Sequence, residues 1–383
     1  MKTPARLLPA LTVLCVGSVV LPLAPVRGDD LGPLLEKLRA VGPEGRGHRA
    51  AAAAWSELVE RADAEQLPAI LTGLDGANPL AANWVRAAAD AVAERALKRD
   101  GKLPAGPLIA FVQDTDRSPK GRQLAFEWLR QSDAQAAGAL IPRLLDDPSL
   151  ALRREAVRRL TGDAIQVLEL SDASKAVPVF RRAFDAARDL DQVTELAKRL
   201  RDLGQEADLA RHFGFITRWK EIGPFDNTGE KGFDVAYPPE KELDFDAEYD
   251  GKHGRVKWFE LTSDHDYGRV DFHKALAEEK GVVAYAATEF FSEGEQEVEF
   301  RLSSFNATKL WLGGRLIDEH NVYHSGSQFD QYVSRATLRP GRNVILVKVC
   351  QNEQTQSWAR KWYFQLRVCD EIGTAILSTD RPK

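Results

Sequence analysis

Apolar residues recur at helical spacing through the first half of the chain. Between residues 29 and 209 they fall three and four positions apart and almost never alternate with polar residues. This period is typical of amphipathic helices that bury one face. The clearest unit runs from Ala139 to Leu160, where Asp147 and Pro148 separate two apolar stripes. We therefore predict consecutive helices that pack in antiparallel pairs.

That unit resembles a HEAT repeat, with Pro142 in its first helix and Asp147 at the turn. Arg153 and Val157 stand at matching places in the second helix. Two weaker copies precede it, at the spacing of roughly 35 to 40 residues that stacked helical hairpins require. The resemblance implies a HEAT-like α-solenoid over residues 29–209, with a long surface that either binds other proteins or serves only as a spacer. The sequence leaves both roles open.

The pattern changes to the two-residue alternation of strands after about residue 213. Val298, Phe300 and Leu302 alternate with charged residues and share one face, and Gly313-Gly314 is a tight-turn signal. Nine strands without a long helix fit a β-sandwich. The expected strands are 215–222, 255–261, 282–291, 295–303, 308–312, 315–319, 332–338, 343–350 and 361–369.

Two segments of this half resemble the sugar-binding, galactose-binding-like jelly-roll domain of β-galactosidase-type glycoside hydrolases. Trp311-Leu-Gly-Gly-Arg315 matches the end of a strand in that domain, although Gly313 replaces the customary Asn. Leu338–Val349 matches the turn and apolar strand that follow. The resemblance covers mainly residues 295–350 and implies a jelly-roll sandwich over residues 210–383. Carbohydrate binding is implied by the resemblance alone, because in many members of the superfamily the module is only a structural brace.

The order of the two halves also has a parallel. The segments Trp219–Asn227 and Tyr237–Glu240 resemble the entry to β-domains of uncharacterised secreted bacterial proteins that carry HEAT-like helical repeats. The fold class is therefore expected to be multi-domain, an all-α solenoid followed by an all-β jelly-roll sandwich.

The first residues predict export. Lys2 and Arg6 precede an apolar run over residues 7–26, which is the pattern of a signal peptide. We place cleavage after Gly28, so residues 1–28 are removed. No later stretch approaches the roughly 20 apolar residues of a membrane span. The mature chain is expected in the periplasm or outside the cell, without a membrane span.

Composition and charge narrow the class of protein further. A chain of 383 residues, with 44% hydrophobic and 28% charged residues, has the composition of an ordered globular protein. At roughly 100 to 200 residues per domain its length fits two domains. The formal net charge of −5 gives no electrostatic footprint for nucleic acid, so nucleic acid is excluded as a partner.

Two cysteines follow the predicted cleavage point, Cys350 and Cys369. An exported chain with an even count of cysteines is a candidate for a disulfide. In a simple hairpin that turns near Gln356, however, Cys350 lies opposite Trp362 and Cys369 falls out of register. The alternatives are a Cys350–Cys369 disulfide and two free thiols.

Carbohydrate recognition needs an exposed aromatic ring for stacking and polar side chains at its edge for the hydroxyl groups. Tyr323, Trp358 and Trp362 have the required chemistry. Each of these aromatic residues has an alternative place in the sandwich core. The candidate polar rim consists of Gln328, Asp330, Asn352, Glu353 and Gln354.

Metal ligands are sparse in the sequence. Several histidines and carboxylates lie in the β half, but no set has the spacing of a zinc site. Asp264, Asp266 and Asp271 supply the oxygens that calcium prefers. No cofactor is expected, and a structural calcium ion is the alternative considered.

No nucleophile elbow, His-Glu-x-x-His zinc motif, phosphate loop or dinucleotide fingerprint occurs in the sequence. We therefore expect an exported, non-enzymatic protein whose sandwich binds carbohydrate or another cell-envelope component and whose helices contact a protein. The first alternative is a structural scaffold that contacts only proteins. The second is a glycoside hydrolase-like enzyme with an acidic pair among the β loops.

Overall fold

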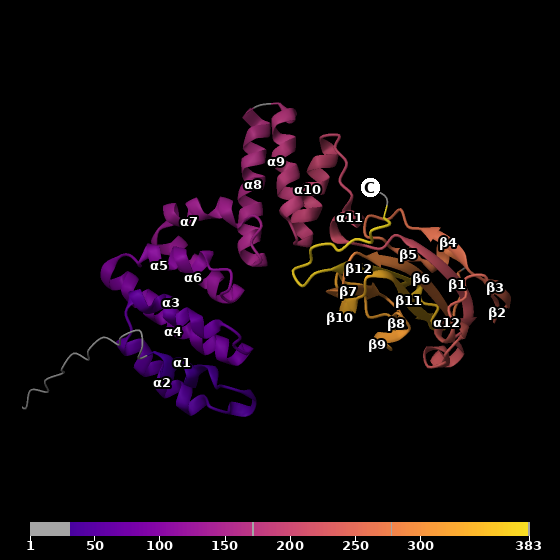
Figure 1. Cartoon of the computed structure of the whole chain (residues 1–383), viewed down its shortest axis with the longest axis horizontal. Helices are drawn as coiled ribbons and strands as arrows, with labels where there is room; N and C mark the ends of the chain where they lie inside the picture. Colours follow the sequence, from indigo (N-terminus) through magenta and orange to yellow (C-terminus); the bar gives the residue numbers. More distant parts are fainter. Residues whose placement is uncertain (1–30, 171, 277, 382–383) are drawn as a thin grey trace, which may run out of the picture. The chain divides into compact units, whose positions relative to one another are not determined.

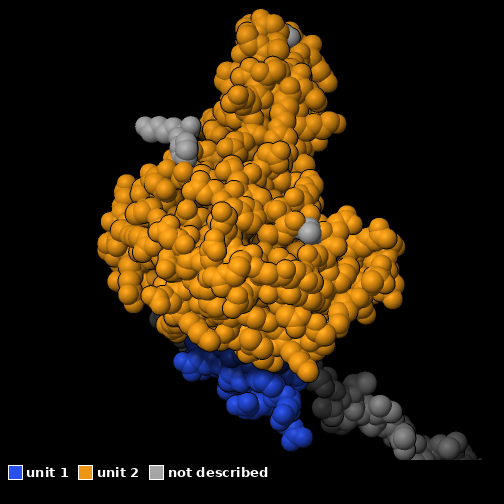
Figure 2. Space-filling model, turned by 90° about the vertical axis from the view of Figure 1, so that its right-hand side faces the viewer, with its two compact units in different colours: residues 1–139 blue, residues 140–383 orange. Residues whose placement is uncertain are grey.

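A computed structural model of the chain describes residues 31–170, 172–276 and 278–381. They form two compact units, divided in the sequence between Ala139 and Leu140 (Figure 2). The predicted signal peptide and its cleavage point lie outside the described residues, so export stays a prediction. None of the described helices has the length and apolar character needed to cross a lipid bilayer.

The first unit is built from helices that pack on their neighbours in sequence. Its helices are α1 Gly32–Arg39, α2 His48–Arg61, α3 Leu67–Leu71, α4 Pro79–Asp100, α5 Ala105–Gln113, α6 Pro119–Ser132 and α7 Ala134–Leu140. Helix α1 packs on α2, α3 on α4, and α5 on α6. The predicted helical pattern is thus confirmed for this part of the chain. Stacking of the pairs as a HEAT-like solenoid stays a prediction.

Helix α4 shows how the sequence sets the bounds of these helices. Asn78 Oδ1 accepts hydrogen bonds from the backbone N of Leu80 and Ala81, both at 3.0 Å, and Pro79 occupies the first turn. At the other end Gly101 has a φ of 71°, which a glycine adopts without steric cost. The buried face of α4 is largely alanine, which allows the close approach of α1, α2 and α3.

The second unit begins with helices and continues into the strands. Its longer helices are α8 Leu150–Leu170, α9 Ala173–Ala186 and α10 Leu190–Asp202, followed by the short α11 Leu209–Phe213. Helix α9 packs between α8 and α10. The turn before α8 is closed by Asp147, whose Oδ1 accepts from Ser149 N at 2.7 Å. Composition placed a boundary at residue 209, whereas contacts group these helices with the strands that follow.

The strands form an antiparallel β-sandwich (Figure 1). The six-stranded sheet has the order β4-β1-β6-β11-β8-β9 and the four-stranded sheet the order β10-β7-β12-β5. Their bounds are β1 Arg218–Asp226, β4 Phe259–Thr262, β5 Val270–Asp271, β6 Val282–Ser292, β7 Gln296–Ser304, β8 Ala307–Leu312, β9 Arg315–His320, β10 Tyr332–Leu338, β11 Gly341–Gln351 and β12 Tyr363–Cys369. A small hairpin of β2 Glu248–Gly251 and β3 Gly254–Lys257 forms a two-stranded sheet of its own and contacts β1. The predicted combination of a helical part and a β-sandwich is confirmed.

One predicted strand is divided in the structure. The expected strand 255–261 is split at Trp258 into β3, which pairs only with β2, and β4, which pairs with β1. The short β5 and the helix α13 Phe272–Ala275 were not predicted. Two residues of β5 are too few to leave an alternation in the sequence.

The central strands of the six-stranded sheet are buried on both faces. Its inner face and the four-stranded sheet share one core, in which Ala284, Phe300 and Leu366 are fully buried. Its outer face carries a second core beneath residues 227–258, which we call the cover segment. Because β6 is buried on both sides, its residues 282–287 are apolar throughout and do not alternate with polar ones.

A buried ion pair fixes the cover segment to the sheet. Lys348 of β11 is fully buried, and its Nζ lies 2.7 Å from Glu240 Oε1. The same ammonium donates to the carbonyl oxygens of Phe233 and Val235, at 3.0 and 2.9 Å. The hydroxyl of Tyr285 donates to Glu240 as well. A buried charge is tolerable only when it is paired and hydrogen-bonded, as Lys348 is here.

The two cysteines do not form the disulfide that was considered. Cys350 lies in β11 of the six-stranded sheet and Cys369 in β12 of the four-stranded sheet, and both are free and buried. Burial raises the pKa of the Cys350 thiol to about 12 and that of Cys369 to about 11. Such thiols stay protonated at neutral pH and are poor nucleophiles.

Candidate functional site

The structure brings together four of the residues predicted to bind a ligand. Tyr323, Asn352, Glu353 and Trp358 lie in loops that follow β9 and β11. A third loop joins them after β1, the η6 turn Thr228–Phe233. We call the following set the Trp358 loop cluster: Asn227, Glu230, Tyr323, His324, Asn352, Glu353 and Trp358.

Trp358 is the exposed aromatic residue of this cluster. It belongs to the short 3-10 turn η7 Ser357–Ala359, and 56% of its surface is open to solvent. The ring of His324 meets it in an edge-to-face arrangement, with ring centroids 5.1 Å apart. His324 Nε2 in turn donates to Asn352 Oδ1 at 2.8 Å. The bond to Asn352 orients the His324 ring against the indole, which remains more than half exposed.

Two carboxylates flank this aromatic pair. Glu230 Oε1 accepts from Asn352 Nδ2 at 3.1 Å, and Glu353 Oε2 accepts from the backbone N of Gly229 at 3.0 Å. Both glutamates are exposed. These bonds cross between the loops after β1 and β11, so each carboxylate also ties one loop to the other.

A network of buried amides supports the cluster from below. Asn227 and Gln351 are fully buried, and Asn227 Nδ2 donates to Gln351 O at 3.0 Å and to the hydroxyl of Tyr323 at 3.2 Å. Asn306 Nδ2 donates to Gln351 Oε1 at 2.6 Å. Gln351 Nε2 donates to Ala359 O at 3.2 Å, next to Trp358. These bonds tie the loops together, although Asn227 Oδ1 and Asn306 Oδ1 have no hydrogen-bond partner within the described residues.

Burial also affects the phenol of the cluster. Tyr323 is half-buried, and its burial raises the pKa of its hydroxyl well above the ordinary value. The phenol therefore stays protonated at any physiological pH. It accepts a hydrogen bond from Asn227 and keeps its own proton to donate.

Gln354 and Gln328, two further residues of the predicted polar rim, are both exposed. Gln354 is exposed beside the cluster, and its backbone N donates to Asn352 Oδ1 at 3.3 Å. Gln328 is exposed as well, and its carbonyl oxygen accepts from Ser303 Oγ at 2.6 Å.

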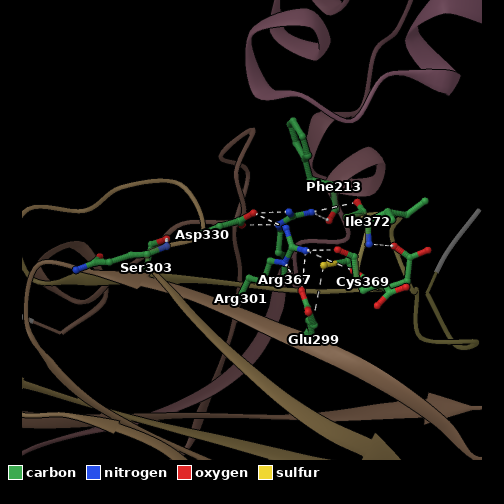
Figure 3. Close-up of polar contacts among 12 residues, drawn as sticks. Phe213, Glu299, Arg301, Ser303, Asp330, Arg367, Cys369 and Ile372 are labelled. Carbon is green, nitrogen blue, oxygen red and sulfur yellow. Dashed lines mark hydrogen bonds and ion pairs between the residues drawn. The ribbon is translucent and has the colours of Figure 1, made fainter. Parts of the chain in front are cut away.

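Asp330 is committed to an ion-pair network on the four-stranded sheet (Figure 3). Its carboxylate accepts two hydrogen bonds from Arg367, at 2.7 and 2.6 Å, and one from Arg301 at 2.7 Å. Arg367 Nη1 also donates to Phe213 O at 3.1 Å, so the network holds α11 against the sheet. Asp330 was predicted as a ligand-binding residue, but its oxygens are already occupied in this structural role.

Trp362 is a core residue. It is 1% exposed, packs against Phe272 with ring centroids 5.0 Å apart, and donates its indole N–H to Val349 O at 3.3 Å. It therefore presents no ring face to a ligand in solution, contrary to its place among the candidate plates. Trp362 directly precedes β12, and every residue of β12 is buried. A strand that is buried on both faces shows no alternation of polar and apolar residues, so no local pattern in the sequence indicated that Trp362 points inward.

The three aspartates considered for calcium differ in their surroundings. Asp266 pairs with Arg201 at 2.7 Å, Asp271 caps α13 by accepting from His273 N at 3.1 Å, and Asp264 is exposed. Within the described residues no group of three His, Cys, Asp or Glu side chains is placed to hold a metal ion. Calcium binding at this loop stays an untested prediction.

Sequence reasoning missed Asn227, Glu230 and His324 as members of the cluster. Asn227 and Glu230 precede Trp358 by more than a hundred positions in the chain, and only the closure of the sheet brings them to it. His324 is one of the histidines of the β half, whose spacing indicated no zinc site, and in the structure its ring contacts Trp358. An exposed Trp with polar residues upstream was the one local signal available.

Comparisons with known proteins give no family. No protein-family model and no curated protein matches the chain. Solved structures match weakly. A β-glucuronidase of an uncultured Clostridium sp. has 13% identity and a TM-score of 0.25 over 41% of this chain and 29% of its own. A β-glucosidase from Kluyveromyces marxianus in complex with glucose has 10% identity and a TM-score of 0.27 over 66% and 34%. A GH31 α-xylosidase from Xanthomonas citri has 14% identity and a TM-score of 0.20 over 40% and 16%.

These matches correct one prediction. The chain was expected to be non-enzymatic, whereas the solved structures that it matches are chains of glycoside hydrolases. The chain spans about a third or less of the length of these three proteins. At such low identity and TM-score, the matches assign neither a reaction nor a substrate to this chain.

Proposed function

We propose that the sandwich binds a carbohydrate chain at the Trp358 loop cluster. The observation that carries this proposal is Trp358 itself, an indole that is more than half exposed although it is held by His324 on a buried polar foundation. Single exposed apolar residues scattered over a protein surface are common. In this chain the exposed indole of Trp358 lies among three loops, those that follow β1, β9 and β11.

The surroundings of the ring fit a sugar. The apolar C–H face of a pyranose packs on an indole, while hydroxyl groups at the edge of the sugar need donors and acceptors. Glu230 and Glu353 supply charged acceptors, and the phenol of Tyr323 supplies a donor. Because the carboxylates are exposed, their remaining lone pairs are free to accept bonds from hydroxyl groups.

Substitution of Trp358 tests the proposal. Titration of the whole protein with neutral oligosaccharides, followed by calorimetry, is expected to show binding that Trp358→Ala weakens by about tenfold or more and Trp358→Phe by less. Trp84→Ala is the matched control, because Trp84 also meets a histidine edge-on, His48 at 6.0 Å, but lies in α4. Equal affinity in wild type and Trp358→Ala would refute the proposal.

Glycoside hydrolysis is the second candidate function, and the two carboxylates of the cluster favour it. Glycosidases place two carboxyl groups on either side of the scissile bond, one to protonate the leaving oxygen and one to attack or to activate water. Glu230 and Glu353 are the two carboxylates of the cluster. Glu230 accepts a hydrogen bond from Asn352 and Glu353 accepts one from Gly229, so each carboxylate reaches across to the other's loop.

Turnover separates hydrolysis from binding alone. If the cluster hydrolyses glycosides, Glu230→Gln and Glu353→Gln are each expected to lower kcat by at least about a hundredfold while leaving the affinity for the product largely intact. Glu293→Gln, an exposed glutamate in the turn between β6 and β7, is the control. Activity that survives both substitutions would exclude these carboxylates as the catalytic pair.

A further inference from the structure

A groove lies along another margin of the sandwich. The edge strand β9 of the six-stranded sheet and the edge strand β10 of the four-stranded sheet lie against one another. Beside them and the start of β11 is a groove with a volume of about 950 Å³. Its lining contains one acidic residue, Glu295, and four arginines, Arg315, Arg335, Arg339 and Arg342. The Trp358 loop cluster follows the opposite end of β9.

A tight turn presents the first arginine. Gly313 and Gly314 join β8 to β9 with φ values of 57° and 80°, a turn that only glycines form without strain. Gly313 N donates to Val344 O at 2.8 Å, which anchors the turn to β11. Arg315 follows directly and is exposed. Its backbone is therefore held in place before any ligand arrives.

A second turn presents Arg339 beside it. Asn343 is 6% exposed and bridges this turn, because its Nδ2 donates to Arg339 O at 2.8 Å and to Gly341 O at 3.1 Å. Its Oδ1 accepts from Arg339 N at 2.9 Å. Asn343 thus closes the turn from inside and leaves the Arg339 side chain on the exterior.

The arginines of the groove differ in their partners. Arg335 pairs with Glu299 at 3.1 Å, and Arg342 with Glu289 at 2.6 Å. Within the described part of the chain, neither Arg315 nor Arg339 has a side-chain hydrogen bond or ion pair. Two unpaired guanidinium groups on adjacent rigid turns make the groove locally cationic, although the whole chain has a formal net charge of −5.

We propose that this groove binds an acidic polysaccharide, with Arg315 and Arg339 each taking one uronate carboxylate of the chain. The planar guanidinium fork matches the two oxygens of a carboxylate. Leu316 and Ala336, which also line the groove, offer apolar surface for the C–H faces of the sugar rings. This site is separate from the Trp358 loop cluster, and the inference does not depend on the function proposed for that cluster.

An acidic peptide is the other occupant that the charge admits, and the geometry favours the polysaccharide. A peptide that extends a sheet pairs its backbone with an edge strand and needs its ligands along that strand. Arg315 and Arg339 stand instead at turns, at the first residue of β9 and just after β10. An acidic polysaccharide carries carboxylates at intervals and needs no pairing with a strand, so it fits two arginines that stand at turns.

The experiment compares three probes on the whole protein: polygalacturonate, the neutral glucan pullulan and polyglutamate. We expect polygalacturonate to bind and pullulan not to bind in this groove, with an affinity that falls as salt rises above about 0.15 M. The double variant Arg315→Gln/Arg339→Gln is expected to lose about tenfold or more of that affinity. Arg315→Lys/Arg339→Lys keeps the two charges but not the guanidinium forks. Its affinity for polygalacturonate should lie between those of wild type and the Gln double variant.

The control removes the same charge elsewhere. Arg49→Gln/Arg143→Gln changes two exposed arginines that lie outside the groove and is expected to leave polygalacturonate binding unchanged. Equal losses in both double variants would reduce the effect to net charge and overturn the proposal. Polyglutamate that binds as tightly, with the same dependence on Arg315 and Arg339, would assign the groove to acidic peptides and overturn it as well.

The outcome is also separable from that of the proposed function. Polygalacturonate binding that is lost in Trp358→Ala and kept in Arg315→Gln/Arg339→Gln would place the acidic sugar at the Trp358 loop cluster. That result would reject the groove and support the cluster. The reverse pattern would support the groove, whatever the cluster binds.

Discussion

At the scale of single residues, Glu221 is the least expected side chain of the sandwich. It lies in β1, between Phe259 of β4 and Ala286 of β6, and is fully buried. Within the described residues neither of its carboxyl oxygens has a hydrogen-bond partner. Burial, with a smaller contribution from the negative charge of Asp271, raises its pKa to about 8. The folded protein therefore holds a neutral carboxylic acid here at neutral pH.

This carboxyl group makes stability depend on pH. Between its ordinary pKa of 4.5 and about 8, the folded chain keeps a proton that the unfolded chain has released. The stabilising contribution is complete below pH 4.5 and is lost as pH rises towards 8, by about 1.4 kcal/mol per unit. Glu221→Gln has no proton to lose, so we expect a smaller decline in its free energy of unfolding across this window.

Urea unfolding at pH 5 and at pH 8 measures that difference. Wild type should lose more stability than Glu221→Gln between the two conditions, and the variant should be the more stable protein at pH 8. Glu260→Gln, in the neighbouring strand β4 with an 83% exposed side chain, should keep the slope of wild type. Parallel pH profiles for wild type and Glu221→Gln would show that Glu221 ionises normally.

At the scale of elements, the cover segment depends on one buried cation. Lys348 alone bonds two carbonyl groups of this segment and the carboxylate of Glu240, while Tyr285 bonds the same carboxylate from β6. Removal of one member of a buried ion pair leaves the other charge without compensation.

Lys348→Met is therefore expected to cost about 3 to 5 kcal/mol of unfolding free energy, measured by urea denaturation. The double variant Lys348→Met/Glu240→Gln removes the stranded charge as well and should recover part of that loss. Lys220→Met, which removes an ammonium paired at the surface with Glu260 at 3.1 Å, should cost about 1 kcal/mol or less. A loss in Lys348→Met as small as that of Lys220→Met would mean that the cover segment is held by its apolar contacts.

The elements were also what the sequence predicted best. Strand β10 has the bounds expected for it, 332–338, and its burial alternates along the strand, although Val333 is exposed and Ser334 is buried. Which side chains are buried was harder to predict from the sequence. Trp358 and Trp362 are four positions apart and chemically identical, yet one is 56% and the other 1% exposed. Only the packing of distant segments separates them.

At the scale of the whole molecule, the candidate site was predicted in part. Tyr323, Asn352, Glu353 and Trp358 were found because they lie in loops next to predicted strands. Asp330 was misplaced because its partners, Arg301 and Arg367, come from β7 and β12 and are not visible in local sequence. The arginine groove was not predicted at all, since its lining comes from separate turns that only the pairing of β8, β9 and β11 brings together.

The attachment of α11 to the four-stranded sheet has a practical consequence. Arg367 bonds Phe213 O, the ring of His212 lies 4.3 Å from that of Phe184 in α9, and Arg201 of α10 pairs with Asp266. A cut at the boundary predicted from composition, near residue 209, would keep the Arg367 contact but separate His212 from Phe184 and Asp266 from Arg201. A fragment of the sandwich that is meant to fold alone should therefore begin before its first strand and retain α8, α9 and α10.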